Sequence, residues 1–402
     1  MLTTAQASRA ITESMPDFGT ESVALELAAG RVLRQRVTAE RDQPPFDRVT
    51  MDGIAVRFAS LDSGNRQFGI QGTQNAGDPV QTLQSDDGCI EIMTGGVLPK
   101  GCDCIIPVER ISVDDGIAVI EENYEASARQ FIHPQGSDHV DGHEVLQPGS
   151  VITPMDVAII ASCGLSEVEV GRAPIIRVIS TGNELVAPGL PVAAHQIRMS
   201  NGPALVAMLS EQGFAHSSHD HLSDDVEILE REIGRHLDAA DVMILSGGVS
   251  MGKADFVPQV LESLGVKVVF HKISQRPGKP MWFGIGPKGQ AVFALPGNPV
   301  SSLVCCRQYV LPAMLRASGR HDSLPRFAVL TEDVTFGANL TCFLPVRTSS
   351  RDDGSVSAVP VPTNTSGDFA ALSNTDGYVE LRLEDSEFPA GSILPLHLWE
   401  SP

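Results

Sequence analysis

The stretch Ile175-Ile-Arg-Val-Ile-Ser180-Thr-Gly-Asn-Glu184 decides the fold of the middle of the chain. It joins a short, β-branched apolar run to a small polar turn, and similar apolar runs recur at 242–246, 266–270 and 291–295. Amphipathic stretches separate these runs, at 203–212, 224–237, 257–264 and 300–317. Buried strands that alternate with helices are typical of a parallel sheet covered on both faces. The pattern therefore predicts a doubly wound α/β domain over residues 174–320.

The flanking segments have other patterns. The first forty residues read as helical, with Thr3 or Thr4 as the cap, until Gln43-Pro44-Pro45-Phe46 imposes an extended chain. Gly-rich sequence with short β-type runs follows, and residues 130–150 form a polar connection that returns toward the N-terminal region. After residue 320, five short β-type runs predict a small barrel or sandwich.

Length and composition bound the class of protein. The chain has 402 residues, and 50 acidic against 29 basic side chains give a formal net charge of −21. This length predicts two to four domains, and 42% hydrophobic residues indicate a globular protein. We expect a cytoplasmic protein without membrane contact, because there is no long apolar run, no signal-peptide pattern and an odd count of seven cysteines. The acidic excess and the 5% aromatic content argue against nucleic acid as a partner.

Small polar turns follow three of the predicted strands. In a doubly wound sheet such turns lie at the edge where ligands bind, and Gly-rich turns let backbone amides approach a phosphate. Any α/β fold needs some of these turns, and no Gly-Lys-Ser/Thr of a Walker loop is present, so each turn alone is weak evidence. Together they predict a phosphate-bearing ligand, held by Thr181, Gly182, Ser246, Gly247, Gly248, Ser250, Gly252, Pro296, Gly297, Asn298 and Pro299.

A charge anomaly points to the same domain. The 59 residues from Ser263 to His321 contain no Asp or Glu but eight Lys and Arg. Lys272, Arg276 and Lys279 fall within eight positions, beside a Pro-Gly-Lys-Pro turn. A basic cluster without carboxylates in so acidic a protein fits an oxyanion, although a solvated turn is the plain alternative.

Carboxylates in turns supply a second kind of candidate. Asp52, Glu184, Asp224 and Asp255 could hold a hard divalent cation beside a phosphate. Asp224, however, could simply cap the next helix together with Glu227.

Cysteine and histidine groups carry little functional signal. Cys102 with Cys104 and Cys305 with Cys306 lack a second ligand pair at zinc spacing. The histidines between 216 and 221 resemble a metal cluster but lie in what reads as an ordinary connection.

The motifs in order resemble one known family over almost the whole chain. Pro45-Phe-Asp-Arg-Val-Thr-Met-Asp52-Gly-Ile-Ala-Val is similar to the family segment PxFDNSAMDGYAV, and the segment around Thr94-Gly-Gly and Leu98-Pro-Lys-Gly is similar to TGAPLPxGAD. Ser180-Thr-Gly-Asn-Glu-Leu, Ser246-Gly-Gly-Val-Ser-Met-Gly, Pro277-Gly-Lys-Pro and Leu295-Pro-Gly-Asn-Pro follow in the family order. The family is that of the MoeA proteins, molybdopterin molybdenumtransferases similar to the E domain of gephyrin.

The resemblance implies an elongated homodimer with four domains in each subunit. These are a discontinuous N-terminal linker domain at 1–43 plus 140–173, a β-rich domain at 44–139, a MogA-like α/β domain at 174–320 and a small C-terminal β-barrel at 321–402. Each active site then lies between the α/β domain of one subunit and the β-rich domain of the other. A MogA-type adenylyltransferase and molybdoenzyme maturation proteins are the further partners that it suggests.

The resemblance also implies the reaction. Adenylylated molybdopterin is cleaved, AMP leaves, and the dithiolene sulfurs ligate molybdate to give the molybdenum cofactor. Mg²⁺, or alternatively Zn²⁺, is the implied metal, with Glu184, Asp224 and Asp255 as its ligands. Carried over by motif, the catalytic positions are Asp52, Thr94, Glu184, Asp224, Asp255, Lys272, Arg276 and Lys279.

Several residues depart from the family pattern. Arg48-Val49-Thr50 replace Asn-Ser-Ala, Ser137 replaces a usual Glu, Asn183 replaces a usual Asp, and Arg276 stands where Lys is common. These changes leave two alternatives open: a weakened paralogue that binds or delivers finished cofactor, or an enzyme that inserts tungstate.

Overall fold

The computed structural model describes residues 1–249, 256–322, 324–337, 339–363 and 365–400. The chain divides into two compact units, one of Met1–Arg34, Pro148–Thr153 and Val168–Pro402, the other of Gln35–Gln147 and Pro154–Glu167. The four-domain boundaries predicted from the sequence stay a prediction, because this division resolves two units.

A six-stranded sheet of order β16-β13-β17-β21-β20-β18 forms the centre of the first unit. Its strands are β13 (Ile176–Thr181), β16 (Ser217–Leu222), β17 (Val242–Ser246), β18 (Lys267–His271), β20 (Trp282–Ile285) and β21 (Ala291–Leu295). β13 runs parallel to β16 and β17, and β17 runs parallel to β21, whereas β20 is antiparallel to both β18 and β21.

The prediction of an all-parallel sheet was therefore wrong in detail, since the sheet is mixed. Two strands were missed. The connection with histidines at 216–221 contains β16, an edge strand whose polar sequence Ser-Ser-His-Asp-His hides it. β20 is only four residues long and contains Gly284, so its apolar run is short.

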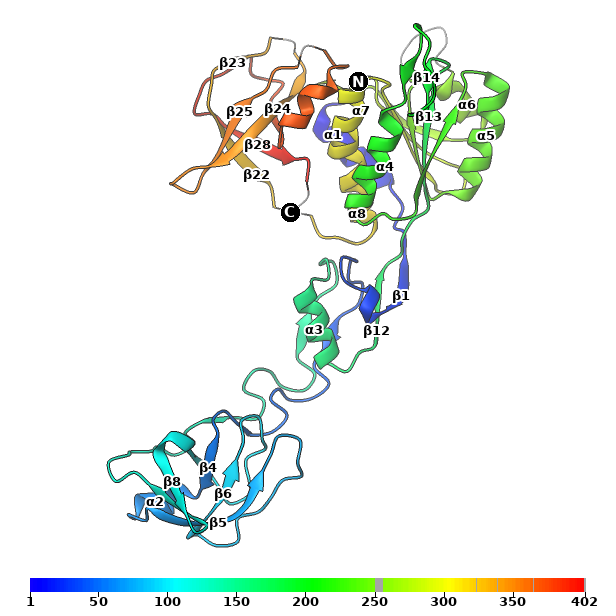
Figure 1. Cartoon of the computed structure of the whole chain (residues 1–402). Coiled ribbons are helices and arrows are strands. Elements are labelled where there is room, and N and C mark those ends of the chain that lie inside the picture. The colour runs from blue at the N-terminus through cyan, green and yellow to red at the C-terminus, as the bar shows by residue number, and fades with distance from the viewer. Residues whose placement is uncertain (250–255, 323, 338, 364, 401–402) are drawn as a thin grey trace. The chain divides into compact units, whose positions relative to one another are not determined.

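Helices cover both faces of this sheet (Figure 1), which confirms the doubly wound α/β architecture. One face packs against α1 (Thr4–Ser14), α4 (Asn201–Glu211), α7 (Pro299–Cys305) and α8 (Leu311–Ala317), and a π-helical turn, η3 (Cys306–Val310), joins the last two. The other face packs against α5 (Val226–Ala239) and α6 (Val257–Ser263).

Helix α5 shows how the sequence produces these elements. Leu229, Ile233 and Leu237 recur every four residues and are buried against the sheet. The side chain of Asp225 caps the helix by accepting a hydrogen bond from the Ile228 amide at 3.0 Å. The alternative reading of Asp224 as the cap is therefore wrong by one residue.

The N-terminal segment is helical for a shorter stretch than expected. Thr3 caps α1 through a capping box with Gln6, and the helix ends at Ser14, just before Met15-Pro16. β1 (Thr20–Ala24) and the 3₁₀ turn η1 (Leu25–Leu27) follow, and β1 pairs with β12 (Glu167–Gly171). A short parallel pair, β14 (Leu185–Val186) and β15 (Ile197–Arg198), lies before α4.

A closed five-stranded barrel ends the same unit. β22 (Arg326–Leu330), β25 (Val356–Pro360), β24 (Thr341–Ser350), β26 (Gly377–Leu381) and β28 (Ile393–Leu398) pair in this order, and β28 pairs back to β22. β19 (Gln275–Arg276), which belongs to the α/β layer in sequence, pairs with β24. The shorter elements β23 (Val334–Thr335), η4 (Phe369–Asn374) and β27 (Glu387–Phe388) complete this region. The predicted C-terminal barrel is confirmed.

The second unit is β-rich, as predicted. A six-stranded sheet contains β7 (Cys104–Pro107), β4 (Gly53–Val56), β6 (Gly88–Ile92), β5 (Gln67–Gln74), β9 (Ile117–Ile120) and β8 (Ile111–Asp114), in that order. The 3₁₀ turn η2 (Val108–Arg110) follows β7, and α2 (Phe58–Asp62) and α3 (Pro154–Ser162) are the helices of this unit. The returning connection pairs β10 (Ile132–His133) with β3 (Arg48–Val49) and β11 (Glu144–Leu146) with β2 (Val37–Thr38).

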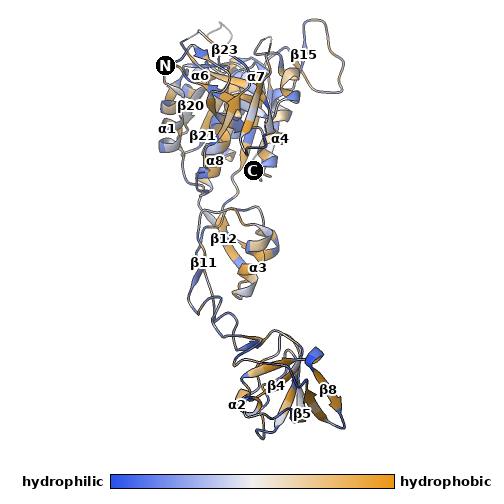
Figure 2. Cartoon of the chain, turned by 90° about the vertical axis from the view of Figure 1, so that its left-hand side faces the viewer, coloured by the Kyte–Doolittle hydropathy of each residue, from blue (hydrophilic) through white to orange (hydrophobic). Residues whose placement is uncertain are grey.

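Apolar side chains are concentrated inside these layers. Figure 2 shows the central strands β20 and β21 in orange, and Trp282, Phe283 and Phe293 on them are at most 1% exposed. Burial of such residues is the main stabilising term of the fold. No helix in the described part of the chain is both long and apolar enough to cross a bilayer.

Candidate functional site

The turns after β13, β17 and β21 lie together, because these strands are parallel neighbours and end at one edge of the sheet. They line a pocket of about 780 Å³, which we call the turn pocket. Of the predicted phosphate-binding residues, the pocket is lined by Thr181, Gly182, Ser246, Gly247, Gly248, Pro296, Gly297, Asn298 and Pro299. Ser250 and Gly252 lie outside the described residues. The ligand-binding role of this set stays a prediction.

Two glycines of the second turn have no room for a side chain. Gly247 and Gly248 have φ values of +104° and +66°. A Cβ would lie 2.6 Å from the Thr181 carbonyl oxygen at Gly247, and 2.6 Å from Val257 Cγ2 at Gly248. The Gly247 N–H already donates to the Leu295 carbonyl at 3.2 Å. Within the described residues, the Gly248 N–H has no acceptor.

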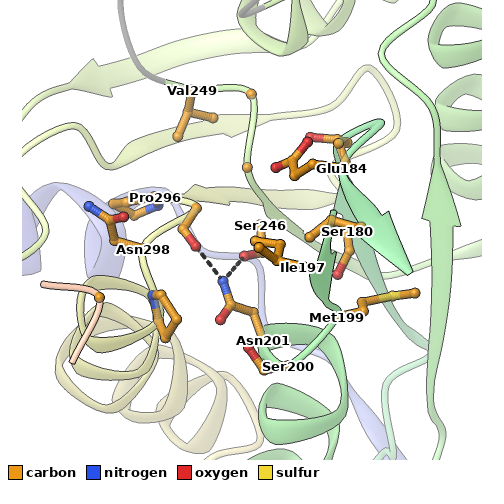
Figure 3. Close-up of a pocket in the computed structure, with 18 of the residues that line it drawn as sticks. Ser180, Glu184, Ile197, Met199, Ser200, Asn201, Ser246, Val249, Pro296 and Asn298 are labelled. Atoms are coloured by element: carbon orange, nitrogen blue, oxygen red, sulfur yellow. Dashed lines mark hydrogen bonds between the residues drawn. The ribbon is translucent and has the colours of Figure 1, made fainter. Parts of the chain in front are cut away.

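Asn201, the first residue of α4, ties two of the turns together. Its Nδ2 donates to Ser246 Oγ at 2.9 Å and to the Gly297 carbonyl at 2.7 Å, as Figure 3 shows. The sequence analysis missed this residue, because it expected the helix to begin at Pro203. Ser200-Asn201 before a helix was the available signal, since these residue types favour helix N-termini.

The two described carboxylates of the predicted metal site both line the turn pocket. Glu184 folds over Gly182, where a Cβ would lie 2.7 Å from Glu184 Oε2. Asp224 exchanges hydrogen bonds with Asn183, since its Oδ2 accepts from the Asn183 amide at 3.3 Å and its own amide donates to Asn183 Oδ1 at 3.1 Å. Asn183 therefore takes part in positioning Asp224, although it departs from the family residue.

The third predicted metal ligand, Asp255, lies outside the described residues. Among the residues that the structure does describe, no group of three His, Cys, Asp or Glu side chains is arranged to hold a metal ion. One polar atom near the carboxylates is nevertheless unpartnered, because the buried Thr181 Oγ1 has no hydrogen bond in the described structure. Oxygen donors of this kind suit a hard cation such as Mg²⁺.

Two histidines of β16 support the turn after β13 from behind. His219 Nε2 lies 2.9 Å from Ser180 Oγ, and His221 Nε2 lies 2.8 Å from the Gly182 carbonyl oxygen. Burial lowers the pKa of His219 and favours its neutral form. These contacts give the histidines a structural place beside the pocket.

Two of the three predicted cations line a second pocket of about 660 Å³, between the α/β layer and the barrel. Arg276 and Lys279 belong to this second pocket, which we call the basic pocket. It shares Pro280, Pro296 and Asn298 with the turn pocket, so the two adjoin. The third cation, Lys272, lines neither of these pockets, and its amide donates to the Met281 carbonyl at 2.8 Å.

A buried polar side chain holds the basic turn. Gln275 is fully buried, accepts a hydrogen bond from the Tyr309 hydroxyl at Oε1, and donates from Nε2 to the Pro277 carbonyl at 2.9 Å. β19 also pairs with the barrel, with Arg276 opposite Cys342. The turn that carries Lys279 is therefore anchored to both the α/β layer and the barrel.

Asp52 and Thr94 lie together in the β-rich unit. Thr94 donates to Asp52 Oδ1 from its amide at 2.6 Å and from its hydroxyl at 2.7 Å. The amide hydrogen bond, followed by that of the hydroxyl, lowers the pKa of Asp52 below its ordinary value. The pair presents an ionised carboxylate in a fixed position, and its catalytic role stays a prediction.

Comparison with known proteins covers nearly the whole chain. Family models match three segments: residues 2–164 match the MoeA N-terminal region (domain I and II), 177–316 a probable molybdopterin binding domain, and 328–399 the MoeA C-terminal region (domain IV). The chain is 39% identical to a protein of Synechocystis sp. named molybdopterin molybdenumtransferase, over 99% of this chain and all of that protein. A protein of the same name from Haemophilus influenzae is 32% identical, over 98% of each.

The structure matches as well. It is similar to the crystal structure of a molybdopterin biosynthesis MoeA protein from Pyrococcus horikoshii, with a TM-score of 0.85 and 29% identity over 100% of both chains. The order of motifs, the α/β layer, the barrel and the full-length relatives agree. The chain belongs to the MoeA family of molybdenum cofactor biosynthesis proteins.

Proposed function

We propose that this protein is a molybdopterin molybdenumtransferase that cleaves adenylylated molybdopterin, releases AMP and inserts molybdate into the dithiolene. The observation that carries the proposal is the pair of adjoining pockets. Gly-rich turns and carboxylates line one, Arg276 and Lys279 line the other, and Pro280, Pro296 and Asn298 belong to both. Two adjoining pockets of this kind suit a phosphate-bearing substrate in one pocket and a separate oxyanion in the other.

The chain's own residues supply two functions in this proposal. The turn pocket binds the phosphates. The Gly248 amide and the N-terminus of α7, which both lie at this pocket, favour the negative charge of a phosphate. The basic pocket holds molybdate near the anhydride through Arg276 and Lys279. As the anhydride P–O bond breaks, the molybdopterin phosphate leaves and the adenylyl phosphorus takes an oxygen from molybdate or water to give AMP. The dithiolene thiols then replace oxygen ligands of molybdate, and these oxygens leave as water with the thiol protons.

We further propose that the reaction uses Mg²⁺, held by Glu184 and Asp224 together with Asp255. Bound there, the cation would neutralise phosphate charge as the leaving group departs. The orphaned Thr181 Oγ1 and the two carboxylates that line the turn pocket support this choice.

The deciding experiment measures AMP release from adenylylated molybdopterin by purified protein with Mg²⁺, with and without molybdate or tungstate. Release that molybdate stimulates, with active cofactor formed, is the expected result. Tight binding without release would instead favour a carrier of finished cofactor, and stimulation by tungstate alone would favour the tungstate enzyme.

Two variants test the roles. Glu184→Gln should abolish the response to Mg²⁺, and Lys279→Ala should raise the molybdate concentration needed for half-maximal release. Lys288→Ala is the matched control, because Lys288 pairs with Asp238 and lines neither pocket. An unchanged molybdate dependence in Lys279→Ala would contradict the oxyanion role.

A homodimer with shared active sites is part of the proposal, since the ionised Asp52 would complete the site of the other subunit. Mixing inactive Asp52→Asn and Glu184→Gln proteins tests it. Random exchange of subunits makes half of the dimers mixed, each with one intact site, so about a quarter of the wild-type activity should return. No recovery after verified exchange would place both residues in the same subunit's site.

A further inference from the structure

One aromatic side chain lies at the turn pocket. Phe369, the first residue of η4, lines the turn pocket and is 45% exposed. It comes from the C-terminal region, whereas the glycine turns come from the α/β layer. Among the described lining residues, it is the sole aromatic one. A partly exposed aromatic ring at the wall of a pocket is a surface for a planar ligand group.

Hydrogen bonds fix the segment that carries this ring. Ser366 contacts the start of α7 twice: its Oγ accepts from Asn298 Nδ2 at 2.7 Å, and its carbonyl accepts from the Val300 amide at 3.1 Å. The Phe369 amide donates to the Gly367 carbonyl at 3.0 Å. The segment that carries the ring is therefore tied to the turn after β21.

The other residues that line the turn pocket form a polar part and an apolar part, which suit a ligand with one charged end and one apolar end. The glycine turns and Asn201 make one part polar, whereas Leu185, Ile197 and Met199 make another part apolar. A phosphate fits the first part, and a flat, weakly polar ring fits between apolar side chains and an aromatic face.

We propose that Phe369 is the stacking face for a planar heteroaromatic ring of the ligand whose phosphate occupies the glycine turns. The inference rests on the proposed function and deepens it by naming the ring subsite. The proposed substrate offers two such rings, a pterin and an adenine, which share the chemistry that a phenyl face recognises.

Binding of three probes tests this directly. AMP carries the adenine ring, a pterin monophosphate carries the pterin ring, and ribose 5-phosphate carries a phosphate without a ring. Phe369→Ala should weaken binding of the ring-bearing probe about tenfold, as loss of one stacking contact predicts, and leave ribose 5-phosphate unaffected. The probe that responds identifies which ring stacks.

A conservative variant supplies a signal independent of activity. Phe369→Trp should retain binding, and its emission, measured as the difference from wild type, should be quenched by the stacked ring. Phe327→Ala is the matched control, because Phe327 is a comparably exposed phenylalanine (49%) on β22 that lines no part of the pocket.

Two results would overturn the inference. Equal weakening of all three probes by Phe369→Ala would make the residue a support of the turn, and unchanged binding of all three would remove it from the site. Turnover measured in the same preparations separates the two proposals. If the wild-type protein turns over and Phe369→Ala binds all probes as well as wild type does, only the ring subsite is refuted. If the wild-type protein neither binds the probes nor turns over, the proposed function is refuted as well.

Discussion

The hydrogen bond between Tyr309 and Gln275 gives the sharpest test of how the basic turn is held. Tyr309 is 2% exposed, Gln275 is 0% exposed, and within the described structure the Tyr309 hydroxyl is the donor to Gln275 Oε1. Tyr309→Phe keeps the ring and removes the donor, so a buried acceptor is left unsatisfied. A loss of this kind costs about 1–3 kcal/mol of unfolding free energy.

Tyr378→Phe provides the matched comparison. Tyr378 is also fully buried, and its hydroxyl donates to Gln308 Oε1 at 2.8 Å. Because Gln308 is only partly buried, Tyr378→Phe should cost stability, but no more than Tyr309→Phe does. Only Gln275, however, also donates to the Pro277 carbonyl and thereby holds the turn that carries Lys279. Tyr309→Phe alone should raise the molybdate concentration for half-maximal AMP release, by about threefold to tenfold if about 0.7–1.4 kcal/mol of positioning is lost.

Urea unfolding of both variants and the molybdate dependence of both give the four numbers needed. A stability loss below about 0.5 kcal/mol in Tyr309→Phe would refute the buried hydrogen bond as a contributor. Equal stability losses with equal molybdate dependence would refute the link between Gln275 and the basic turn.

Three further substitutions test other local contacts. Asn201→Ala removes two hydrogen bonds that join the turns, about 0.5–1.5 kcal/mol each, and should lower kcat/KM for AMP release by about tenfold or more. Gly278→Ala should destabilise the protein far more than Gly289→Ala in thermal unfolding, since both have φ near +90° but only at Gly278 would a Cβ meet a side-chain sulfur and an amide. Asp241→Asn should be less stable than wild type at neutral pH, because the hydrogen bond from Arg172 lowers the folded-state pKa of Asp241. The extra stability of wild type is fully present above the pKa of Asp241 in the unfolded chain, about 4. In urea unfolding it should disappear as the pH falls through the lower pKa that Asp241 has in the folded protein.

Much of the fold could be predicted from local patterns. The runs at 242–246 and 291–295 became β17 and β21 with the same bounds, because buried parallel strands are written as continuous apolar sequence. β16 could not be found in this way, since an edge strand with His219 and His221 has no apolar signature. The helical reading of the first forty residues failed because it relied on mixed spacing past Pro16.

The candidate site was predictable only in part. Turns after adjacent parallel strands must share an edge, so Thr181, Ser246 and Pro296 could be grouped from the sequence alone. The basic cluster was found by its charge, but spacing alone did not show that Lys272 lies apart from Arg276 and Lys279. Side chains that are neighbours in one turn can point in different directions. Which direction each takes depends on tertiary contacts, which local spacing does not reveal.

The contribution of the C-terminal region to the turn pocket could not be predicted from the sequence, because it too depends on tertiary contacts. Phe369 follows a stretch that reads as an ordinary polar connection, and its place at the turn pocket depends on the contacts of Ser366 with Asn298 and Val300. These contacts join residues far apart in the chain. The low aromatic content, which argued against nucleic acid as a partner, says nothing about where a single ring lies.

The separation of charge between the two pockets explains why they adjoin without cancelling one another. No salt bridge among the described residues joins Arg276 or Lys279 to a carboxylate, and the surrounding 59 residues contain no Asp or Glu that could do so locally. The carboxylates Glu184 and Asp224 lie in the neighbouring pocket instead. Cations that are already paired would exchange one partner for another when an oxyanion binds, whereas cations left unpaired gain their full interaction from the ligand. Under the proposed function, a window without acidic residues would leave the cations of the basic pocket free for an oxyanion in a protein of net charge −21. Placing a carboxylate in that pocket should then weaken molybdate binding more than it alters stability.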